Sequence, residues 1–182
     1  MFSWLLLFLV QTILASRGSL RLHRKLGFFS VSLAILMWIS MVAASIRQVL
    51  AKDGPFFLDI VSLQLVLLVM FTVFFSWAFR ARQDPGTHRR AMTFSVVVLL
   101  QAATDRILWL PAPHMPDQHW ELDLYVYALI VPLFVFDLVS SRRLHPVTLI
   151  GTAIVVTGHV VVNLLWGTAA WHRFVEGMKR LA

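Results

Sequence analysis

The sequence predicts an all-α integral membrane protein: a single transmembrane domain, residues 1–182, in which six transmembrane helices pair as three antiparallel hairpins. Two observations predict this fold. Hydrophobic residues make up 59% of the chain and charged residues 14%, whereas soluble domains carry about 25% charged residues. The hydrophobic residues also gather in six segments separated by polar turns, as expected of a chain that crosses a bilayer repeatedly.

The six apolar segments cover, in order, residues 1–16, 27–50, 55–79, 91–110, 121–141 and 146–171. A helix that crosses ~30 Å of hydrocarbon needs about 20 residues, within a range of about 17–25. The second, third, fourth and sixth segments meet this length. The fifth meets it only by including Glu121, Asp123 and Asp137, and the first is short.

The distribution of cations predicts the orientation. No Lys or Arg precedes the first segment, and a basic cluster follows it, which is the reverse of a cleaved signal peptide and predicts a retained first helix. The turns after the first, third and fifth segments hold ten Lys and Arg residues, against six elsewhere, out of sixteen in the chain. The positive-inside rule places these three turns in the cytoplasm and both termini outside.

The composition also narrows the classes of function. The chain has no cysteine, which excludes disulfides, iron–sulfur clusters and thiolate metal sites. Its net charge of +7 comes from cations beside apolar segments, a pattern typical of contact with anionic lipid and not of nucleic-acid binding. The motifs GxSxG, HExxH, HxxxH and the phosphate-binding loop are missing from the sequence. Whether the chain is an enzyme stays open.

A basic stretch with a histidine recurs in the three cytoplasmic turns, which read RGSLRLHRKLG, RQDPGTHRRAM and SSRRLHPVTLI. Each places a histidine at or just before the next helix: His23, His88 and His145. In the first two, the histidine lies six positions after an arginine. A helix N-terminus carries free N–H groups and a partial positive charge. If the three helices are neighbours, their imidazoles and arginines therefore form one site that attracts anions.

Three kinds of ligand fit such a site, and the residues leave the choice open. Three histidines suit a divalent metal such as zinc, copper or iron. A histidine with one partner suits haem b, and a redox role follows if haem or a quinone binds. The arginines suit an anion, either a lipid phosphate, a carboxylate or haem propionates, and they repel a metal cation. Asp137, the only membrane-embedded acid expected on this side, would neutralise an arginine or complete a metal set.

His159 is the only histidine expected near the middle of the membrane, with Asn163 one turn later on the same face. Ionisable residues inside a membrane are functional candidates, although a neutral histidine bonded to a neighbouring helix is an equal alternative. Fourteen residues separate His145 from His159, which gives ~21 Å of rise and about 40° of rotation. That spacing suits two stacked haems, but no other helix has a matching pair, and Gln101 is a poor axial ligand.

On the outer side we expect paired charges, since an unpaired ion at that depth is costly; the residues are Arg47, Asp59, Asp105, Arg106 and Asp123. Five tryptophans are expected near the outer interface, where indole is favoured: Trp4, Trp109, Trp120, Trp166 and Trp171. Gly151 and Gly158 indicate close contact of the last segment with another helix.

Taken together, LHRKLG, HRRAM and FDLVSSRRLHP resemble the motifs of a family of small uncharacterised bacterial six-helix inner-membrane proteins. That family shows HRxLG after its first helix, an HKRLM-like motif entering its fourth, an arginine near that helix's end, and YD…R…HP between its last two helices. The matching residues are His23, Arg24, Leu26, Gly27, His88, Arg90, Met92, Arg106, Asp137, His145 and Pro146. Ala91 stands in place of leucine and Phe136 in place of tyrosine, and His159 lies outside the pattern.

The resemblance covers essentially the whole chain. It implies the bacterial inner (cytoplasmic) membrane and a shared role for the three cytoplasmic histidines, and it implies no particular activity. The candidate cofactor-binding residues are His23, His88, His145, Asp137, His159 and Arg106, and the first three are also the candidate metal ligands.

The leading hypothesis is a cytoplasm-facing histidine and arginine site that binds a haem, a metal or an anionic ligand such as an anionic lipid. The competing hypothesis is a non-catalytic accessory or assembly subunit, whose helices dock onto another membrane protein in a larger complex. A small transporter comes third, because the chain is short and shows no broken helices.

Overall fold

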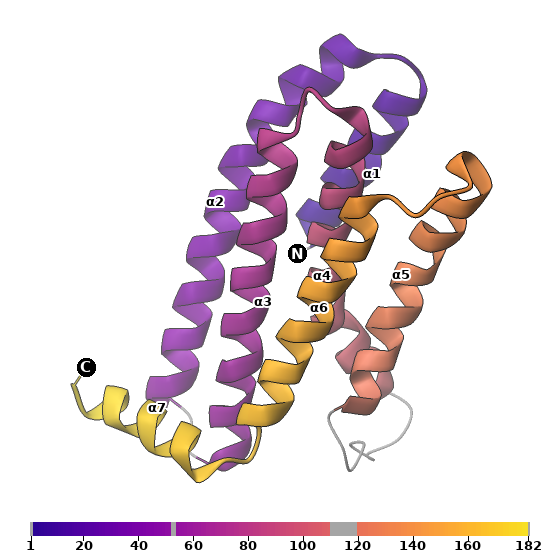
Figure 1. Cartoon of the computed structure of the whole chain (residues 1–182). Helices are drawn as coiled ribbons and strands as arrows, with labels where there is room; N and C mark the ends of the chain where they lie inside the picture. Colours follow the sequence, from indigo (N-terminus) through magenta and orange to yellow (C-terminus); the bar gives the residue numbers. More distant parts are fainter. Residues whose placement is uncertain (1, 52–53, 110–119, 182) are drawn as a thin grey trace.

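The computed structural model describes residues 2–51, 54–109 and 120–181, with side chains for all of these except 51, 102–109, 120–122 and 181. This part of the chain consists of seven helices and has no strand, which confirms the predicted all-α fold. The helices are α1 Phe2–Ser16, α2 Leu20–Ala51, α3 Pro55–Arg80, α4 Pro85–Trp109, α5 Trp120–Ser141, α6 Pro146–Leu165 and α7 Ala169–Leu181 (Figure 1).

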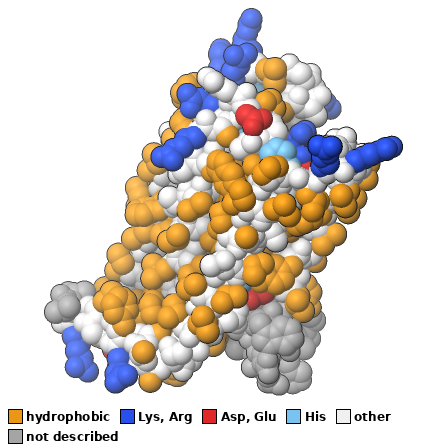
Figure 2. Space-filling view, in the orientation of Figure 1, with side chains coloured by type: hydrophobic (Ala, Val, Ile, Leu, Met, Phe, Trp, Pro, Cys, Tyr) orange, Lys and Arg blue, Asp and Glu red, His pale blue; other side chains and the backbone are white. Residues whose placement is uncertain are grey.

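Four of the described helices, α2, α3, α5 and α6, are long and apolar enough to cross a membrane. α1 is apolar as well, but its 15 residues extend only ~22 Å at 1.5 Å per residue, less than ~30 Å of hydrocarbon. Large hydrophobic side chains are exposed on the outward faces of the helices. In Figure 2 they cover the middle of the visible face, while Lys and Arg gather toward its ends. Exposed apolar surface of this extent is suited to contact with lipid.

Three short turns join α1 to α2, α3 to α4 and α5 to α6 at the same end of the bundle (Figure 1). We call this the basic end, because the three basic sequence stretches lie there. Two of these turns contain a residue in the left-handed region, Gly18 at φ 71° and Arg142 at φ 52°. A left-handed residue reverses the chain directly after a helix, so these two turns bring the next helix back against the previous one.

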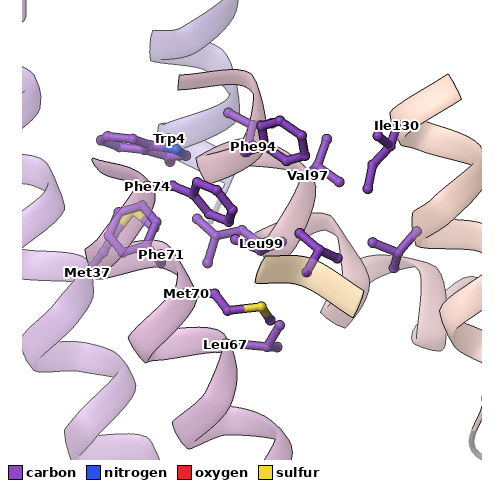
Figure 3. Close-up of a cluster of buried hydrophobic side chains, with 14 of the residues drawn as sticks. Trp4, Met37, Leu67, Met70, Phe71, Phe74, Phe94, Val97, Leu99 and Ile130 are labelled. Carbon is purple, nitrogen blue, oxygen red and sulfur yellow. The ribbon is translucent and has the colours of Figure 1, made fainter. Parts of the chain in front are cut away.

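α4 lies at the centre of the bundle and contacts α1, α3, α5 and α6. Its Phe94 is fully buried and stacks on Phe74 of α3, with ring centroids 5.1 Å apart. The surrounding hydrophobic cluster is drawn in Figure 3. Trp4, which the sequence places near the outer interface, is instead buried in this cluster, with its ring edge-on to Phe71 at 5.4 Å. α1 therefore contributes to the core through its N-terminal half.

Two glycines of α6 allow neighbouring helices to approach closely, as the sequence predicts. A Cβ added at Gly151 would lie 2.3 Å from the ring of Phe94, and one at Gly158 would lie 2.5 Å from Sδ of Met70. Both distances are too short for a real contact. α6 therefore packs against α4 at one glycine and against α3 at the other.

Two helices begin earlier than the apolar segments predict. α2 begins at Leu20 rather than at residue 27, and α4 begins at Pro85 rather than at residue 91. The prediction excluded the basic residues because charge is costly in hydrocarbon. A helix can nevertheless continue past the hydrocarbon into water, where charged side chains are solvated. The basic stretches therefore form the first turns of the helices, and the turns themselves are shorter.

The sixth apolar segment is shorter than predicted, and α7 follows it as a separate helix across the opposite end of the bundle (Figure 1). Trp171 donates its indole N–H to the carbonyl oxygen of Leu58 at 2.8 Å. Oδ1 of the buried Asp59 lies 2.8 Å from Nε2 of His172 and accepts from the backbone N–H of Gly167 at 2.9 Å. The expected pairing of Asp59 within an outer charge network is therefore wrong, because the segment after α6 supplies its partners.

Candidate functional site

The structure divides the candidate residues into three groups. His23 and His88 lie together at the basic end. Asp137 and the backbone of His145 belong to a buried network with an arginine. His159 lies in a second polar cluster deeper in the bundle. Arg106 falls within α4, but its side chain lies outside the described residues.

His23 of α2 and His88 of α4 are neighbours. Their ring centroids are 6.3 Å apart, and the ring planes are nearly perpendicular at 89°. Each is the fourth residue of its helix, so both imidazoles lie at the same depth beneath the basic end. Both side chains are partly exposed. The structure thus brings together two of the three histidines that share the repeated pattern.

One ring nitrogen of each histidine is fixed by a helix carbonyl. Nδ1 of His88 lies 2.8 Å from the carbonyl oxygen of Ala78, and Nδ1 of His23 lies 3.3 Å from that of Gln11. A carbonyl oxygen only accepts, so Nδ1 carries the proton in both rings. In the part of the chain with described side chains, neither Nε2 atom is among the buried polar atoms that lack a partner. Because both side chains are partly exposed, the Nε2 atoms are the ring nitrogens left to meet a ligand.

Asp137 is the centre of a buried network that joins α4, α5 and α6. Its side chain is 0% exposed and that of Arg90 is 6% exposed. Oδ1 of Asp137 accepts from Nε of Arg90 at 2.9 Å and also from its Nη2. Oδ2 accepts from Oγ1 of Thr148 at 2.5 Å and from the backbone N–H of His145 at 2.9 Å. Arg90 also donates through Nη1 to the carbonyl oxygen of Gly86 at 2.9 Å.

Four donors occupy the Asp137 carboxylate, which offers about four lone pairs. No acceptor position is then left for a metal ion. Of the two roles that the sequence left open for Asp137, the geometry corresponds to neutralising an arginine, whose Nε and Nη2 both donate to Oδ1 in charge-assisted hydrogen bonds. The network therefore holds three helices together at the basic end.

His145 has a different position from the other two histidines. Its Nδ1 accepts from the backbone N–H of Val147 at 3.2 Å, so it caps α6. It precedes the first residue of its helix, whereas His23 and His88 follow theirs by three positions. This difference of four residues corresponds to ~6 Å along a helix. Within the described residues, no group of three or more His, Asp or Glu side chains could hold a metal ion, so the three-histidine ligand set is not assembled.

The basic end carries far more positive than negative charge at its surface. Nine of its cations are exposed: Arg17, Arg21, Arg24, Lys25, Arg80, Arg82, Arg89, Arg142 and Arg143. The acids of these turns are the buried Asp137 and the exposed Asp84. Hydrogen bonds from the side chain and backbone of Thr87 hold the pKa of Asp84 below its ordinary value, so it is ionised. The basic end therefore has nine exposed cations and one exposed carboxylate, so its surface is strongly positive.

A second polar cluster joins the same three helices deeper in the bundle. Oδ1 of Asp123 accepts from Nε2 of Gln101 at 3.2 Å and lies 3.3 Å from Nδ1 of His159. Oδ2 accepts from Nδ2 of Asn163 at 2.8 Å. The hydroxyl of Tyr127 lies 3.2 Å from the same Nδ1. Asp123 therefore contacts amide and imidazole groups rather than joining the expected outer network.

Sequence reasoning missed Arg90 and Thr148 as the partners of Asp137, and it did not connect Asp123 with Gln101. One signal was available, because a lone carboxylate inside a membrane needs a cation, and Arg90 is the basic residue nearest the apolar part of α4. A scan against protein-family models and searches of curated proteins and of solved structures each found no match for this chain. Function therefore has to be inferred from the side chains of the chain itself.

Proposed function

We propose that this chain is a multi-pass protein of the bacterial inner membrane that binds phosphate groups at its basic end, on the cytoplasmic side. His23, His88 and the surrounding cations would bind the phosphate. A lipid headgroup and a soluble phosphate present the same anionic oxygens, and the basic end would bind either through them. Anionic lipid is the form always present at this surface.

The orientation is supported by the distribution of charge. The exposed cations of the basic end exceed the Lys and Arg residues of the rest of the chain, as the positive-inside rule requires of cytoplasmic turns. The anionic lipids of the cytoplasmic leaflet attract such clusters, at about 1 kcal/mol for each Lys or Arg near the surface. The cluster of exposed cations therefore supports both parts of the proposal, the cytoplasmic position of the basic end and an anionic ligand.

The observation that carries the proposal is the arrangement of the two imidazoles. Their Nδ1 atoms are fixed to carbonyl oxygens, and their ring centroids lie 6.3 Å apart. When protonated, each ring has its second N–H at Nε2 directed away from its own helix contact. Two fixed donors at this spacing can bind one tetrahedral anion without first ordering their side chains, and such preorganisation increases affinity.

The start of α2, the helix that carries His23, also has a surface hollow that would suit a headgroup. Ser19, Arg21, Leu22 and Lys25 line an open hollow of about 360 Å³ at the start of α2. It offers a hydroxyl, two cations and an apolar side chain. A lipid headgroup needs such an open hollow, because its acyl chains must remain in the bilayer.

A divalent metal is less well matched to these residues. It would meet nine exposed cations, and the donors already bound to Asp137 remove the buried carboxylate from the ligand set, which leaves Asp84 as the one exposed carboxylate of these turns. Haem would offer two carboxylates to the same cations and is distinguishable by its absorption. A Soret band in the purified protein would replace the phosphate proposal by a haem proposal.

The test measures lipid retention by native mass spectrometry of the full chain. The wild type is mixed in detergent with phosphatidylglycerol, with phosphatidylcholine or with inorganic phosphate. We expect retention of phosphatidylglycerol well above phosphatidylcholine, and a loss of about tenfold or more when Arg24 and Arg89 are both changed to Ala, given about 1 kcal/mol per cation. Retention of inorganic phosphate instead of lipid would identify a soluble phosphate as the ligand.

Two comparisons make this test specific. A control variant with Arg173→Ala and Arg180→Ala removes the same charge from exposed positions of α7, and it should leave retention unchanged. The variant with His23→Ala and His88→Ala should lose retention, because it removes the two Nε2 donors. If this variant retains phosphatidylglycerol like the wild type, the imidazoles have no part in binding and the proposal fails. Stable co-purification of a larger membrane protein together with that result would favour the accessory-subunit alternative.

A further inference from the structure

The cluster around Asp123 has a charge that its described neighbours do not balance. Asp123 is 3% exposed, Gln101 0% and His159 1%. A buried carboxylate without a compensating charge costs many kcal/mol and normally neutralises or pairs instead. The two side chains that donate to Asp123, those of Gln101 and Asn163, are neutral amides. They hydrogen-bond to the carboxylate without supplying a positive charge.

The ion pairs in the part of the chain with described side chains join Arg90 to Asp137, His159 to Asp123 and His172 to Asp59. His159 is thus the positively ionisable partner that the structure gives to Asp123, and it is positive only when it binds a proton. A carboxyl group can alternatively become neutral by binding that proton itself. In both arrangements the pair holds one proton more than a carboxylate beside a neutral imidazole.

The geometry around Nδ1 of His159 is consistent with a shared proton. This nitrogen lies 3.3 Å from Oδ1 of Asp123 and 3.2 Å from the hydroxyl oxygen of Tyr127. If Nδ1 carries a proton, it donates to one of these oxygens. If Nδ1 is unprotonated, the hydroxyl of Tyr127 or a protonated Asp123 donates to it. Nδ1 keeps its hydrogen bond with Tyr127 in both cases and lies within ion-pair distance of Asp123, so the proton can move without a change of fold.

We propose that Asp123 and His159 form a proton-binding site inside the bundle, which holds one proton at neutral pH and changes the charge of the interior by one unit when the proton leaves. Its ligand is the proton. Tyr127 provides a second hydrogen bond to the imidazole, while Gln101 and Asn163 hold the carboxylate in place. This site is separate from the basic end, on residues that play no part in phosphate binding.

The other titratable groups on the packed elements are accounted for as far as side chains are described. On α5, Asp137 belongs to the basic end and is bound to Arg90. On α3, which packs against α6, Asp59 binds the segment that follows α6. On α4, Gln101 does not titrate. Among the described side chains of this cluster, Asp123, Tyr127 and His159 are therefore the titratable groups. The side chains of Asp105 and Arg106 on α4 lie outside the described residues.

Two spectroscopic readouts on the full chain in lipid nanodiscs test the site at pH 7. Infrared spectra report a protonated carboxyl through its C=O stretch, and ¹⁵N NMR of histidine-labelled protein reports whether His159 is an imidazolium. We expect one of the two signatures in the wild type. The carboxyl band should disappear in the Asp123→Asn variant, or the imidazolium resonances should become those of a neutral ring in that variant. The His159→Gln variant assigns the resonances, and His172→Gln is the matched control that should leave both signatures unchanged.

The wild-type spectra decide the matter even if a variant does not fold. A carboxylate band for Asp123 together with neutral His159 resonances at pH 7 would show that the pair holds no extra proton, and the proposal would be abandoned. An imidazolium that persists in Asp123→Asn would equally overturn it, because the charge would then be balanced elsewhere. A merely structural hydrogen bond would produce neither the carboxyl band nor the change in the ring.

Discussion

α5 carries two buried aspartates whose surroundings differ. Asp123 and Asp137 are fourteen residues apart, which places them ~21 Å apart along the helix and about 40° apart around it. α4 and α6 supply partners to both. At the basic end these partners include a guanidinium, and at the deeper layer they are amides and an imidazole.

The two clusters, one around Asp137 and one around Asp123, form two layers of the bundle. The comparison indicates that the side chain contributed by α4 decides whether the charge of the aspartate is balanced permanently. Arg90 is charged at every pH at which a protein folds, so the layer around Asp137 has a fixed charge balance. Gln101 occupies the equivalent position in the deeper layer and is neutral, so the balance there depends on a proton. One set of three helices thus contains a permanent structural pair and, eleven residues further along α4, a titratable one.

The largest effect on stability should come from replacing Arg90 or Gln101 of α4 with methionine. Methionine is a similarly long side chain, but it has no hydrogen-bond donor. Arg90→Met leaves the Asp137 carboxylate buried without a cation, and we expect it to cost about 3–5 kcal/mol of unfolding free energy. Gln101→Met removes one neutral donor from a carboxylate that can bind a proton, and we expect about 1–3 kcal/mol. Denaturant unfolding in detergent micelles measures both.

The double variant Arg90→Met, Asp137→Leu is the control for that experiment. It removes both charges, so it should cost less than the sum of its two single variants. Equal losses for Arg90→Met and Gln101→Met would contradict the distinction between the two layers.

An intermediate effect is expected from Gly151→Ala, which acts on the spacing that both layers share. The added methyl would overlap the ring of Phe94, a residue that lies on α4 between Arg90 and Gln101. We expect a loss of about 1–3 kcal/mol from overpacking, measured by the same unfolding experiment. Gly177→Ala on α7 is the matched control, because no atom lies within 4 Å of its added Cβ. The stability of the Gly177→Ala variant should rise by up to about 1 kcal/mol. If the Gly151→Ala variant is as stable as the wild type, the helices are loosely packed at that position.

The smallest effect is expected at Asp84, which is exposed and belongs to neither layer. Its pKa is lowered from the ordinary value of 3.8 by hydrogen bonds from Thr87. A lowered pKa in the folded state stabilises the protein above the ordinary pKa, and this stabilisation is lost as pH falls through the lowered pKa. Asp84→Asn should therefore be less stable than the wild type at neutral pH, and the difference should shrink toward pH 3 in thermal unfolding scans. A difference that stays constant over this range would mean that ionisation of Asp84 is irrelevant.

The helical fold could be predicted from the sequence, because apolar segments of membrane length have few alternatives to helix. The starts of α2 and α4 could not, since Arg21, Arg24 and Lys25 are solvated wherever a turn or a helix places them outside the hydrocarbon. α7 was missed for a related reason. Its apolar residues Trp171 and Val175 continue the apolar segment of α6, so the sequence does not show where the chain changes direction.

Part of the candidate site was also readable from the sequence. The common spacing from Arg17 to His23 and from Arg82 to His88 anticipates the pair that the structure forms. His145 follows Arg142 by only three positions, a difference that the prediction of one three-histidine site did not take into account. The partners of Asp123 and Asp137 could not be read, because which residues meet across three helices depends on rotation and register. The resemblance to six-helix inner-membrane proteins remains a prediction.

The docking of α7 also has a consequence for the order in which the protein is made. The ring that binds Asp59 belongs to His172, 113 residues later in the chain. At a synthesis rate of about 5–20 residues per second, that ring leaves the ribosome ~6–23 s after Asp59. During that interval α3 is already synthesised, but its Asp59 does not yet have the His172 ring as a partner. The contacts of α7 at the end of the bundle opposite the basic end therefore form last. In nascent chains halted before residue 167, we expect the Asp59 carboxylate to stay in contact with water.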